Sequence, residues 1–434
     1  MNTSDQPSLE TILSRAIDAH QTGDFESAIQ GYRTVVAHQP QQVAAWYGLG
    51  VLLFHTGSFE ESREAFKQTV KRKPDYADAW NRLGNAHLEL SEIQQAVECY
   101  SRAIALSPNN PHARCNRALA YLISGDDQQG WREYEHRWSL PNHRQPDFPQ
   151  PRWKGEPLSG RTVLLDWEQG LGDSLQFVRF AKIVQQQGGT VILRCQPPLA
   201  TLLRKTPGIE QLVADGEPLP DFDVYAPLMS LPFLLNLKTD SLPKCVPYVF
   251  AESELVKHWS PQIATENGFR IGICWRGNPG HHRDQFRSIP LAEFQTLSSV
   301  PHLRFFSLQK GSLKQNEQHT AEMLSLIDFG DQLDEQHGPF MDTAAIMQNL
   351  DLVITADTAV AHLAGAMGIP VCVLLCDIPE WRWQLKRTDS PWYPTMRLYR
   401  QTSLGDWSGV FQELATDLAG LISHLQNERT PIPA

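Results

Sequence analysis

Two patterns of apolar and polar positions divide the chain. From residue 9 to about residue 140, bulky apolar positions and small positions return together at intervals of 34 residues. From residue 161 onward, short apolar runs alternate with helix-like stretches and with loops that contain glycine, aspartate or arginine. The first pattern predicts a helical repeat, and the second predicts parallel strands connected by helices.

The repeat is clearest in two consecutive copies, with fainter copies before and after them. Matching positions in the two copies are Trp46, Leu49, Gly50, Phe66 and Pro74 in the first, and Trp80, Leu83, Gly84, Tyr100 and Pro108 in the second. These copies resemble tetratricopeptide repeats, each a helix pair in which the small residue admits the neighbouring helix and the proline closes the unit.

The resemblance implies that residues 8–140 form a short α-solenoid. Its concave face, toward which Tyr47, Asn81 and Asn85 should point, is expected to bind a peptide or a partner protein. A purely structural role in docking the next domain is the alternative. A linker with several prolines, residues 141–160, follows the solenoid.

A first α/β domain is expected over residues 161–260. Val163 to Leu165 reads as a strand, and a glycine-rich loop at 168–173 leads into a helix. The loop contains Gly170 and Gly172 but lacks the third glycine of the dinucleotide fingerprint, which disfavours nicotinamide chemistry. Asp173, at the end of this loop, is a candidate general base, and a helix cap is the alternative role.

A second α/β domain is expected over residues 268–434. Within it, Leu352 to Ile354 reads as a buried strand, and Asp357 or Thr358 as the cap of the next helix. Asp357, Thr358 and His362 therefore fall at the carboxyl end of a strand and in the first turn of a helix, where open α/β sheets bind ligands and backbone N–H groups favour phosphate. A cap and an ordinary helix histidine are the structural alternative.

Further polar residues follow two other strands of this domain. Arg276 and Arg287 come after the strand that starts at residue 270, and Gln309 and Lys310 come after the strand near residue 303. Because carboxyl ends of parallel strands share one edge of a sheet, these residues are candidates for binding an anionic donor.

Composition narrows the classes of partner and compartment. The net charge is −11, which disfavours nucleic acid binding. No run approaches the roughly 20 apolar residues needed to cross a bilayer, and the start of the chain lacks a signal-peptide pattern. The seven scattered cysteines fit a reducing cytoplasm, and no spacing predicts a metal site.

Several sequence segments, together with the repeats, resemble segments of bacterial tetratricopeptide proteins that carry a heptosyltransferase-like glycosyltransferase domain. These segments are EQGLGDSLQFVRF at 168–180, WRGNP at 275–279, RSIPL at 287–291, SLQKG at 307–311, DTAVAHLAGAMGIPV at 357–371 and DSPWYPTMRLYRQ at 389–401. The resemblance implies a GT-B fold, in which two Rossmann-like domains bind a nucleotide-sugar mainly through the second domain.

The same resemblance implies an inverting, metal-independent transfer, with Asp173 as the base and Asp357, Thr358 and His362 on the donor side. The family's donor-contacting lysine has no counterpart here, and Arg287 or Arg276 is the nearest cation. The nucleotide-sugar is a substrate, so no cofactor is expected. The alternatives are a non-catalytic adaptor with a degenerate sugar-nucleotide domain, and an epimerase or hydrolase of the same architecture.

Overall fold

The structure is a computed structural model that describes residues 7–429, apart from 142, 144–145, 243, 265–267, 282 and 378–379. The chain forms two compact units. One, here called the helical unit, consists of Met1–Gln145 with Glu380–Leu385. The other, called the α/β unit, consists of Pro146–Pro379 with Lys386–Ala434.

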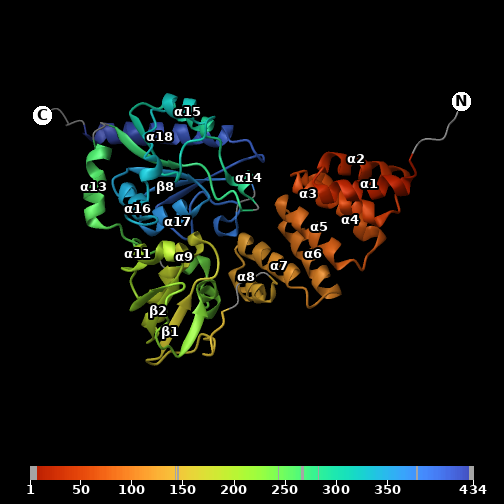
Figure 1. Ribbon diagram of the computed structural model, residues 1–434, viewed down its shortest axis with the longest axis horizontal. Coiled ribbons are helices and arrows are strands. Elements are labelled where there is room, and N and C mark those ends of the chain that lie inside the picture. The colour runs from red at the N-terminus through yellow and green to blue at the C-terminus, as the bar shows by residue number, and fades with distance from the viewer. Residues whose placement is uncertain are drawn as a thin grey trace. The chain divides into compact units, whose positions relative to one another are not determined.

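The helical unit is a succession of antiparallel helix pairs (Figure 1). Its elements are α1 (Leu9–Thr22), α2 (Phe25–His38), α3 (Val43–His55), α4 (Phe59–Arg72), α5 (Ala77–Glu89), α6 (Ile93–Leu106), α7 (Pro111–Ser124), α8 (Asp127–Tyr134), η1 (Glu135–Ser139) and η8 (Trp381–Trp383). The predicted helical solenoid over the N-terminal region is confirmed.

The small positions of the repeat allow the helices of a pair to approach. A Cβ atom at Gly50 would lie 2.8 Å from the ring of Phe66, and one at Gly84 would lie 2.5 Å from the ring of Tyr100. Both rings are fully buried. In these two copies the 34-residue spacing therefore places a glycine opposite each buried aromatic ring.

The tryptophans of the repeat close the loops between pairs. The indole N–H of Trp46 donates to the carbonyl oxygen of Pro40 at 2.8 Å, and that of Trp80 donates to Pro74 at 2.9 Å. Each bond satisfies a loop carbonyl just before the next helix starts. The 34-residue recurrence thus encodes both the packing and the loop closure.

The residues predicted on the concave face lie on first helices of their pairs. Tyr47 is on α3, and its hydroxyl donates to Asp78 of α5. Asn81 and Asn85 are on α5, and both side-chain oxygens accept the amide of Asn116 on α7, at 3.0 Å each. Polar side chains therefore join successive first helices.

The α/β unit contains two parallel sheets. The first has the order β3-β2-β1-β4 and is built from β1 (Thr162–Asp166), β2 (Thr190–Cys195), β3 (Gln211–Ala214) and β4 (Val224–Pro227). Its helices are α9 (Leu171–Phe177), η2 (Val178–Phe180), α10 (Ala181–Gln186), η3 (Pro197–Leu199), α11 (Ala200–Leu203), η4 (Leu228–Ser230), α12 (Leu231–Leu234) and η5 (Thr239–Ser241).

The second sheet has the order β6-β5-β7-β8-β9. Its strands are β5 (Phe269–Cys274), β6 (Leu303–Ser307), β7 (Leu352–Ala356), β8 (Val371–Leu375) and β9 (Met396–Arg400). Its helices are α13 (Ser253–Ala264), α14 (Asp284–Arg287), η6 (Leu291–Ser299), α15 (Gln318–Met323), η7 (Gly330–Gln332), α16 (Met341–Met347), α17 (Ala359–Ala366) and α18 (Ser408–Arg429).

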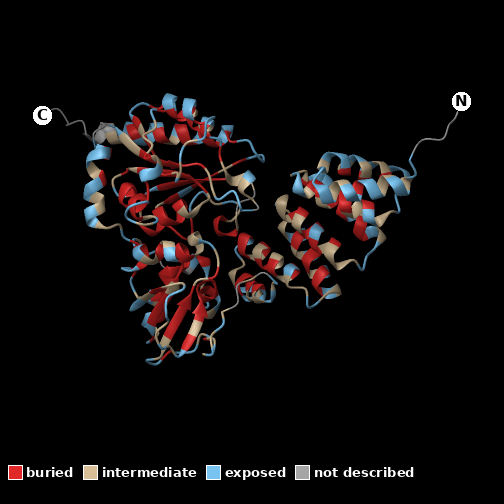
Figure 2. Cartoon of the chain, viewed as in Figure 1, coloured by how far each residue is buried: buried red, intermediate tan, exposed pale blue. Residues whose placement is uncertain are grey.

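Helices cover the sheets, and the central strands are buried (Figure 2). Every residue of β7 and of β8 is buried, as their continuous apolar runs predict. In the second sheet, α18 packs on the core through residues such as Phe411, whose ring meets Phe294 at 4.8 Å. The prediction of parallel strands connected by helices is confirmed.

In each sheet, the direction in which the chain adds successive strands reverses at one point. In the first sheet the chain runs from β1 outward to β3 and returns to β4 beside β1. In the second it runs from β5 to β6 and returns to β7 beside β5. Ligands of open α/β sheets bind at such switch points, so the loops after β1, β5 and β7 are the candidate site.

Candidate functional site

The loop after β1 is the glycine-rich segment, and it ends in the first turn of α9. Gly170 is the residue before the helix, and its N–H donates to the Asp173 carboxylate at 2.7 Å. Asp173 is half-buried. The carboxylate therefore caps α9, as the structural alternative predicted, and its place at the switch point is the one that a base would need.

Gln196, at the end of β2, fixes both sides of the glycine loop. Its amide N–H donates to the carbonyl of Gln169 at 2.9 Å, and its oxygen accepts the hydroxyl of Ser174 at 2.7 Å. Gln196 is 7% exposed. Sequence reasoning missed this residue, because nothing in the local pattern links the end of β2 to the loop after β1.

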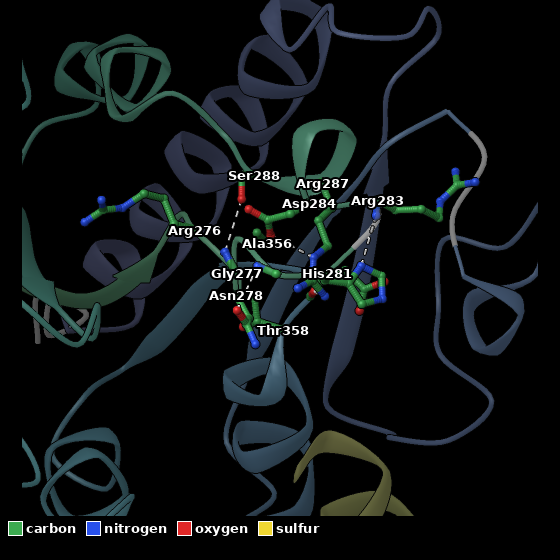
Figure 3. Close-up of polar contacts among 12 residues, drawn as sticks. Arg276, Gly277, Asn278, His281, Arg283, Asp284, Arg287, Ser288, Ala356 and Thr358 are labelled. Atoms are coloured by element: carbon green, nitrogen blue, oxygen red, sulfur yellow. Dashed lines mark hydrogen bonds and ion pairs between the residues drawn. The ribbon is translucent and has the colours of Figure 1, made fainter. Parts of the chain in front are cut away.

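The loop after β7 carries the cap of α17. Thr358 is the cap residue, and its hydroxyl accepts the N–H of Val360 at 3.3 Å. The carbonyl of Asp357 accepts a guanidinium N–H of Arg287 at 2.9 Å. The structure thus brings Arg287, Asp357 and Thr358, three residues predicted to bind the nucleotide-sugar, together at the start of α17. Figure 3 shows Arg287 and Thr358 in this region.

The loop after β5 folds tightly around Arg287. The guanidinium lies 3.2 Å from Asp284, and the N–H of Gly277 donates to the hydroxyl of Ser288 at 3.1 Å. A Cβ atom at Gly277 would lie 2.5 Å from both Arg287 and Asp284. Glycine at position 277 therefore leaves room for the Arg287 and Asp284 side chains in their present positions beside the start of α17.

Arg276 is placed differently from Arg287. Its side chain extends away from Arg287 and Thr358 (Figure 3) and lies 3.4 Å from the carboxylate of Glu317. Its backbone N–H donates to the side-chain oxygen of Gln309 at 2.9 Å. The Arg276 guanidinium is thus joined to Glu317, while its backbone ties the loops after β5 and β6.

Lys310 lies at the surface. Its ammonium is 3.1 Å from the carboxylate of Glu335, and both side chains are more than half exposed. Such a pair contributes little to stability and leaves the lysine able to change partner. The structure does not bring Lys310 together with Thr358 in any described hydrogen bond or ion pair.

His362 lies where two parts of the α/β unit meet: the first lobe, which is the first sheet with its helices, and the second lobe, which is the second sheet with its helices. It is buried on α17, and its Nδ1 lies 3.0 Å from the hydroxyl of Tyr393. Helices α9 and α17 pack together, as Figure 1 shows, and a Cβ atom at Gly172 would lie 2.8 Å from the His362 ring and 3.7 Å from Ala359. The glycine loop and the start of α17 therefore face each other at close contact.

Two groups at strand ends, the buried Cys274 and the partly buried Arg400, add to the site and were not predicted. Burial raises the pKa of the Cys274 thiol to about 11, so Cys274, at 4.0 Å from Thr358, stays neutral near pH 7. Burial lowers the pKa of Arg400 to about 10, an effect that the charges of Cys376 and Asp357 partly offset. Arg400 therefore remains a cation beside Asp357.

No metal cluster is present among the residues that the structure describes: nowhere do three or more His, Cys, Asp or Glu side chains gather in a way that could hold an ion. All seven cysteines are free thiols. No described helix combines the length and apolar character needed to cross a membrane.

Comparison with known proteins identifies the repeats. Residues 13–77 and residues 77–110 each match a tetratricopeptide-repeat model. The helical unit contains tetratricopeptide repeats. The chain is also 27% identical over 323 residues to Protein FlbA of Caulobacter vibrioides, a match that covers 70% of this chain and 54% of FlbA. The chain therefore spans about half the length of the curated relative it matches.

Solved structures with partial similarity include a MamA protein and YrrB. The MamA structure is 27% identical, with a TM-score of 0.29, over 30% of this chain and 72% of MamA. YrrB, described as a TPR protein with an unusual peptide-binding site, is 16% identical, with a TM-score of 0.29, over 31% of this chain and 69% of YrrB.

Proposed function

We propose that this protein is a glycosyltransferase of GT-B type, which moves a sugar from a nucleotide-sugar to an acceptor hydroxyl with inversion and without a metal. The observation that carries the proposal is the contact between Gly172, at the switch point of the first sheet, and His362, on the helix at the switch point of the second. Two nucleotide-type sites that face each other can hold donor and acceptor side by side.

In the proposed reaction the acceptor oxygen bonds to the anomeric carbon as the bond from that carbon to the diphosphate breaks. The acceptor proton passes to the Asp173 carboxylate. The leaving diphosphate takes the electron pair, and its new charge is stabilised by the first N–H groups of α17 and by Arg287. Arg287 supports this role because it is already anchored on the Asp357 carbonyl.

The tetratricopeptide repeats support an acceptor or partner that is a protein. Such repeats bind peptides or partner proteins, so the helical unit would recruit the acceptor or a protein that presents it. If the acceptor were a small molecule, the tetratricopeptide repeats would have no evident role in binding it.

The test separates the chemical role of Asp173 from its capping role. Asp173→Asn keeps an oxygen that can accept the Gly170 N–H but removes the base, so we expect transfer to fall by a factor on the order of 10² to 10⁴ with donor binding retained. Transfer is measured on the full chain with a panel of nucleotide-sugars in the presence of a chelator. Asp126→Asn, at a helix cap that accepts from Gln129, is the matched control and should leave transfer unchanged.

A non-catalytic adaptor is the second candidate, and the capping bond of Asp173 favours it. A carboxylate that accepts the Gly170 N–H already has a structural reason to be there. In that case the wild-type chain binds a nucleoside diphosphate but transfers and hydrolyses nothing. Equal transfer by wild type and Asp173→Asn would instead remove Asp173 from the mechanism.

A further inference from the structure

Two arginines flank strand β5, and their guanidinium groups are bonded differently. Arg270, near the amino end of the strand, forms a forked pair with Asp351, with hydrogen bonds of 2.9 Å from Nε and 2.7 Å from a terminal nitrogen. Arg276 lies just past the carboxyl end, and its side chain donates no hydrogen bond to any residue that the structure describes. This side chain is only 19% exposed, and its Nε is buried. Buried polar groups are nearly always hydrogen-bonded, so the unused guanidinium of Arg276 indicates a partner outside the chain.

Glu317 balances the charge of Arg276 without satisfying its N–H groups. The Glu317 carboxylate lies 3.4 Å from a terminal nitrogen of Arg276, which is an ion-pair distance without a hydrogen bond. Its two oxygens instead accept the indole N–H of Trp275 at 2.9 Å and the backbone N–H of Lys314 at 2.8 Å. The guanidinium therefore lies near a carboxylate whose hydrogen bonds go to other groups, and its own donors stay available for a ligand.

Gln309, which follows strand β6, adds a further donor at this edge of the sheet. Its side-chain oxygen accepts the backbone N–H of Arg276 at 2.9 Å. This bond identifies the oxygen end of the amide, because a backbone N–H bonds only to an acceptor. The amide nitrogen of Gln309 makes no hydrogen bond within the described part of the chain. The carboxyl ends of β5 and β6 thus offer N–H donors whose complement is a ligand with oxygen acceptors.

These donors are separate from the group that the proposed reaction uses for the diphosphate. Arg287 is anchored on the Asp357 carbonyl beside the start of α17, whereas the Arg276 side chain extends away from Arg287 and Thr358 (Figure 3). A diphosphate bound at α17 would therefore leave the Arg276 guanidinium for another part of the ligand. The planar fork of a guanidinium matches the oxygens of a carboxylate or of a phosphate.

We propose that Arg276, assisted by Gln309, binds an oxyanion that the nucleotide-sugar carries in addition to its diphosphate. The oxyanion is a carboxylate of the sugar or a phosphate on the ribose, and both present the same chemistry to the fork. This assignment rests on the proposed function, and it narrows the donor substrate to an acidic nucleotide-sugar. A neutral sugar on an unmodified nucleoside diphosphate would leave the N–H groups of Arg276 without acceptors.

The test compares matched ligands by calorimetry on the full wild-type chain. One arm compares nucleotide uronic acids with their neutral hexose counterparts, such as UDP-glucuronate with UDP-glucose and GDP-mannuronate with GDP-mannose. The other arm compares nucleoside diphosphates with and without a ribose 3′-phosphate. We expect the acidic member of one pair to bind about 10- to 100-fold more tightly, as hydrogen bonds to a charged group allow, and the arm that shows this preference identifies the oxyanion.

The wild-type comparison separates the two proposals without any variant. Equal affinity within every pair, with the nucleotides bound, overturns the oxyanion site and leaves the proposed function standing. If the wild-type chain binds no ligand of either arm, the oxyanion site and the proposed function both fall.

Arg276→Gln tests whether the preference comes from this guanidinium. The variant removes the charge and the fork, so the acidic member should lose its advantage while the affinity for the neutral member is unchanged. The matched control is Arg397→Gln, which removes the same charge from β9, where the half-exposed side chain lies 2.6 Å from Asp417. This control should keep the preference, and its melting curve and that of Arg276→Gln show whether each variant is folded.

Two results with the Arg276 variant would overturn the assignment and leave the proposed function intact. One is a preference for the acidic ligand that persists in Arg276→Gln. The other is an equal loss of affinity for both members of the pair, which would place Arg276 on the diphosphate. Gln309→Glu adds an independent check, because its carboxylate still accepts the Arg276 N–H but replaces the N–H donor with an oxygen. It should weaken binding of the acidic member more than of the neutral one.

Discussion

Gln196 places the glycine loop through a single side-chain amide. The amide joins the Gln169 carbonyl, near the start of the loop, to the Ser174 hydroxyl just after it, and Gln196 itself follows a different strand, β2. Because a buried polar group without a partner costs more than a bond contributes, both partners of this amide depend on it. The position of Asp173 therefore depends on a residue more than 20 positions away in the sequence.

Replacement of this amide should destabilise the α/β unit. Gln196→Leu keeps the size of the side chain but removes its hydrogen bonds to the Gln169 carbonyl and the Ser174 hydroxyl, so we expect the free energy of unfolding to fall by about 1–3 kcal/mol. Denaturant unfolding of the full chain measures this change in the free energy of unfolding. Gln94→Leu, at an exposed position of α6, is the control and should change stability by less than about 0.5 kcal/mol. Equal stability of the Gln196 variant would show that the amide does not hold the loop.

At the scale of elements, continuous apolar runs and their boundaries could be predicted from the sequence. Strands β7 and β8 and the helix between them were predicted, since the apolar run stops at polar residues and Gly368, with φ of 72°, ends the helix region. Strands β3 and β9 were not predicted. Both lie at sheet edges and mix exposed with buried residues, so their runs lack the apolar signal of a central strand.

The candidate site was predictable only where it is local in sequence. Thr358 as the cap of α17 and the polar residues at strand ends follow from the pattern of neighbouring residues. The contacts of Arg179 with Tyr393, and of Tyr393 with His362, join segments that lie far apart in the chain. No periodicity reports such pairs, because they arise only when the two lobes pack.

The glycines of the repeat give a prediction for the helical unit. Gly84→Ala should lower its free energy of unfolding by about 1–3 kcal/mol, since the new methyl group overlaps the buried Tyr100 ring. This loss occurs although alanine favours helix by about 1 kcal/mol. The control is Gly420→Ala on α18, where a Cβ atom meets nothing within 4 Å and stability should rise by about 0.5–1 kcal/mol. Thermal unfolding followed by circular dichroism measures both, and a stabilised Gly84 variant would refute the packing argument.

Histidines with lowered pKa values, above all the buried His87, make the helical unit sensitive to acid. Burial lowers the pKa of His87 below its ordinary value of 6.5, and the Glu92 carboxylate offsets part of this effect. Partial desolvation also lowers the pKa of the half-buried His20 and of His136, but His136 is exposed, so His87 is the main contributor. A group whose folded pKa is lowered binds its proton more readily in the unfolded chain, so its contribution is complete above pH 6.5 and is lost as the pH falls through the folded pKa.

Melting temperatures should therefore fall as the pH drops below about 6.5. His87→Gln removes one of these groups and should make the dependence shallower below about pH 6.5, where the unfolded chain binds a proton at His87 before the folded chain does. The measurement is a series of melting curves on the full chain, followed in parallel for wild type and variant. His112→Gln is the comparison at another histidine of this unit, and identical slopes for wild type and His87→Gln would contradict the assignment.

At the scale of the whole molecule, the two units are not consecutive in sequence. The chain leaves the α/β unit before Glu380 and returns to it at Lys386, so residues 380–385 belong to the helical unit although they follow β8. Within that unit η8 packs on α7, and the rings of Trp381 and Trp131 meet edge to face at 5.1 Å. A helical unit cut after residue 145 would lack this segment, so the repeats depend on a part of the chain more than 200 residues downstream.

Trp381→Ala should consequently weaken the helical unit, although residue 381 lies in sequence within the α/β region. Trp381 is 6% exposed, and loss of a buried tryptophan costs about 3–5 kcal/mol. Hydrogen exchange of the full chain, followed by mass spectrometry, should show reduced protection in α7 with β7 and β8 unchanged. Trp407→Ala is the matched control: that ring is 4% exposed in the core beneath α18, and its loss should deprotect α18 and spare α7. If Trp381→Ala instead deprotects β8 and leaves α7 intact, the segment does not belong to the helical unit.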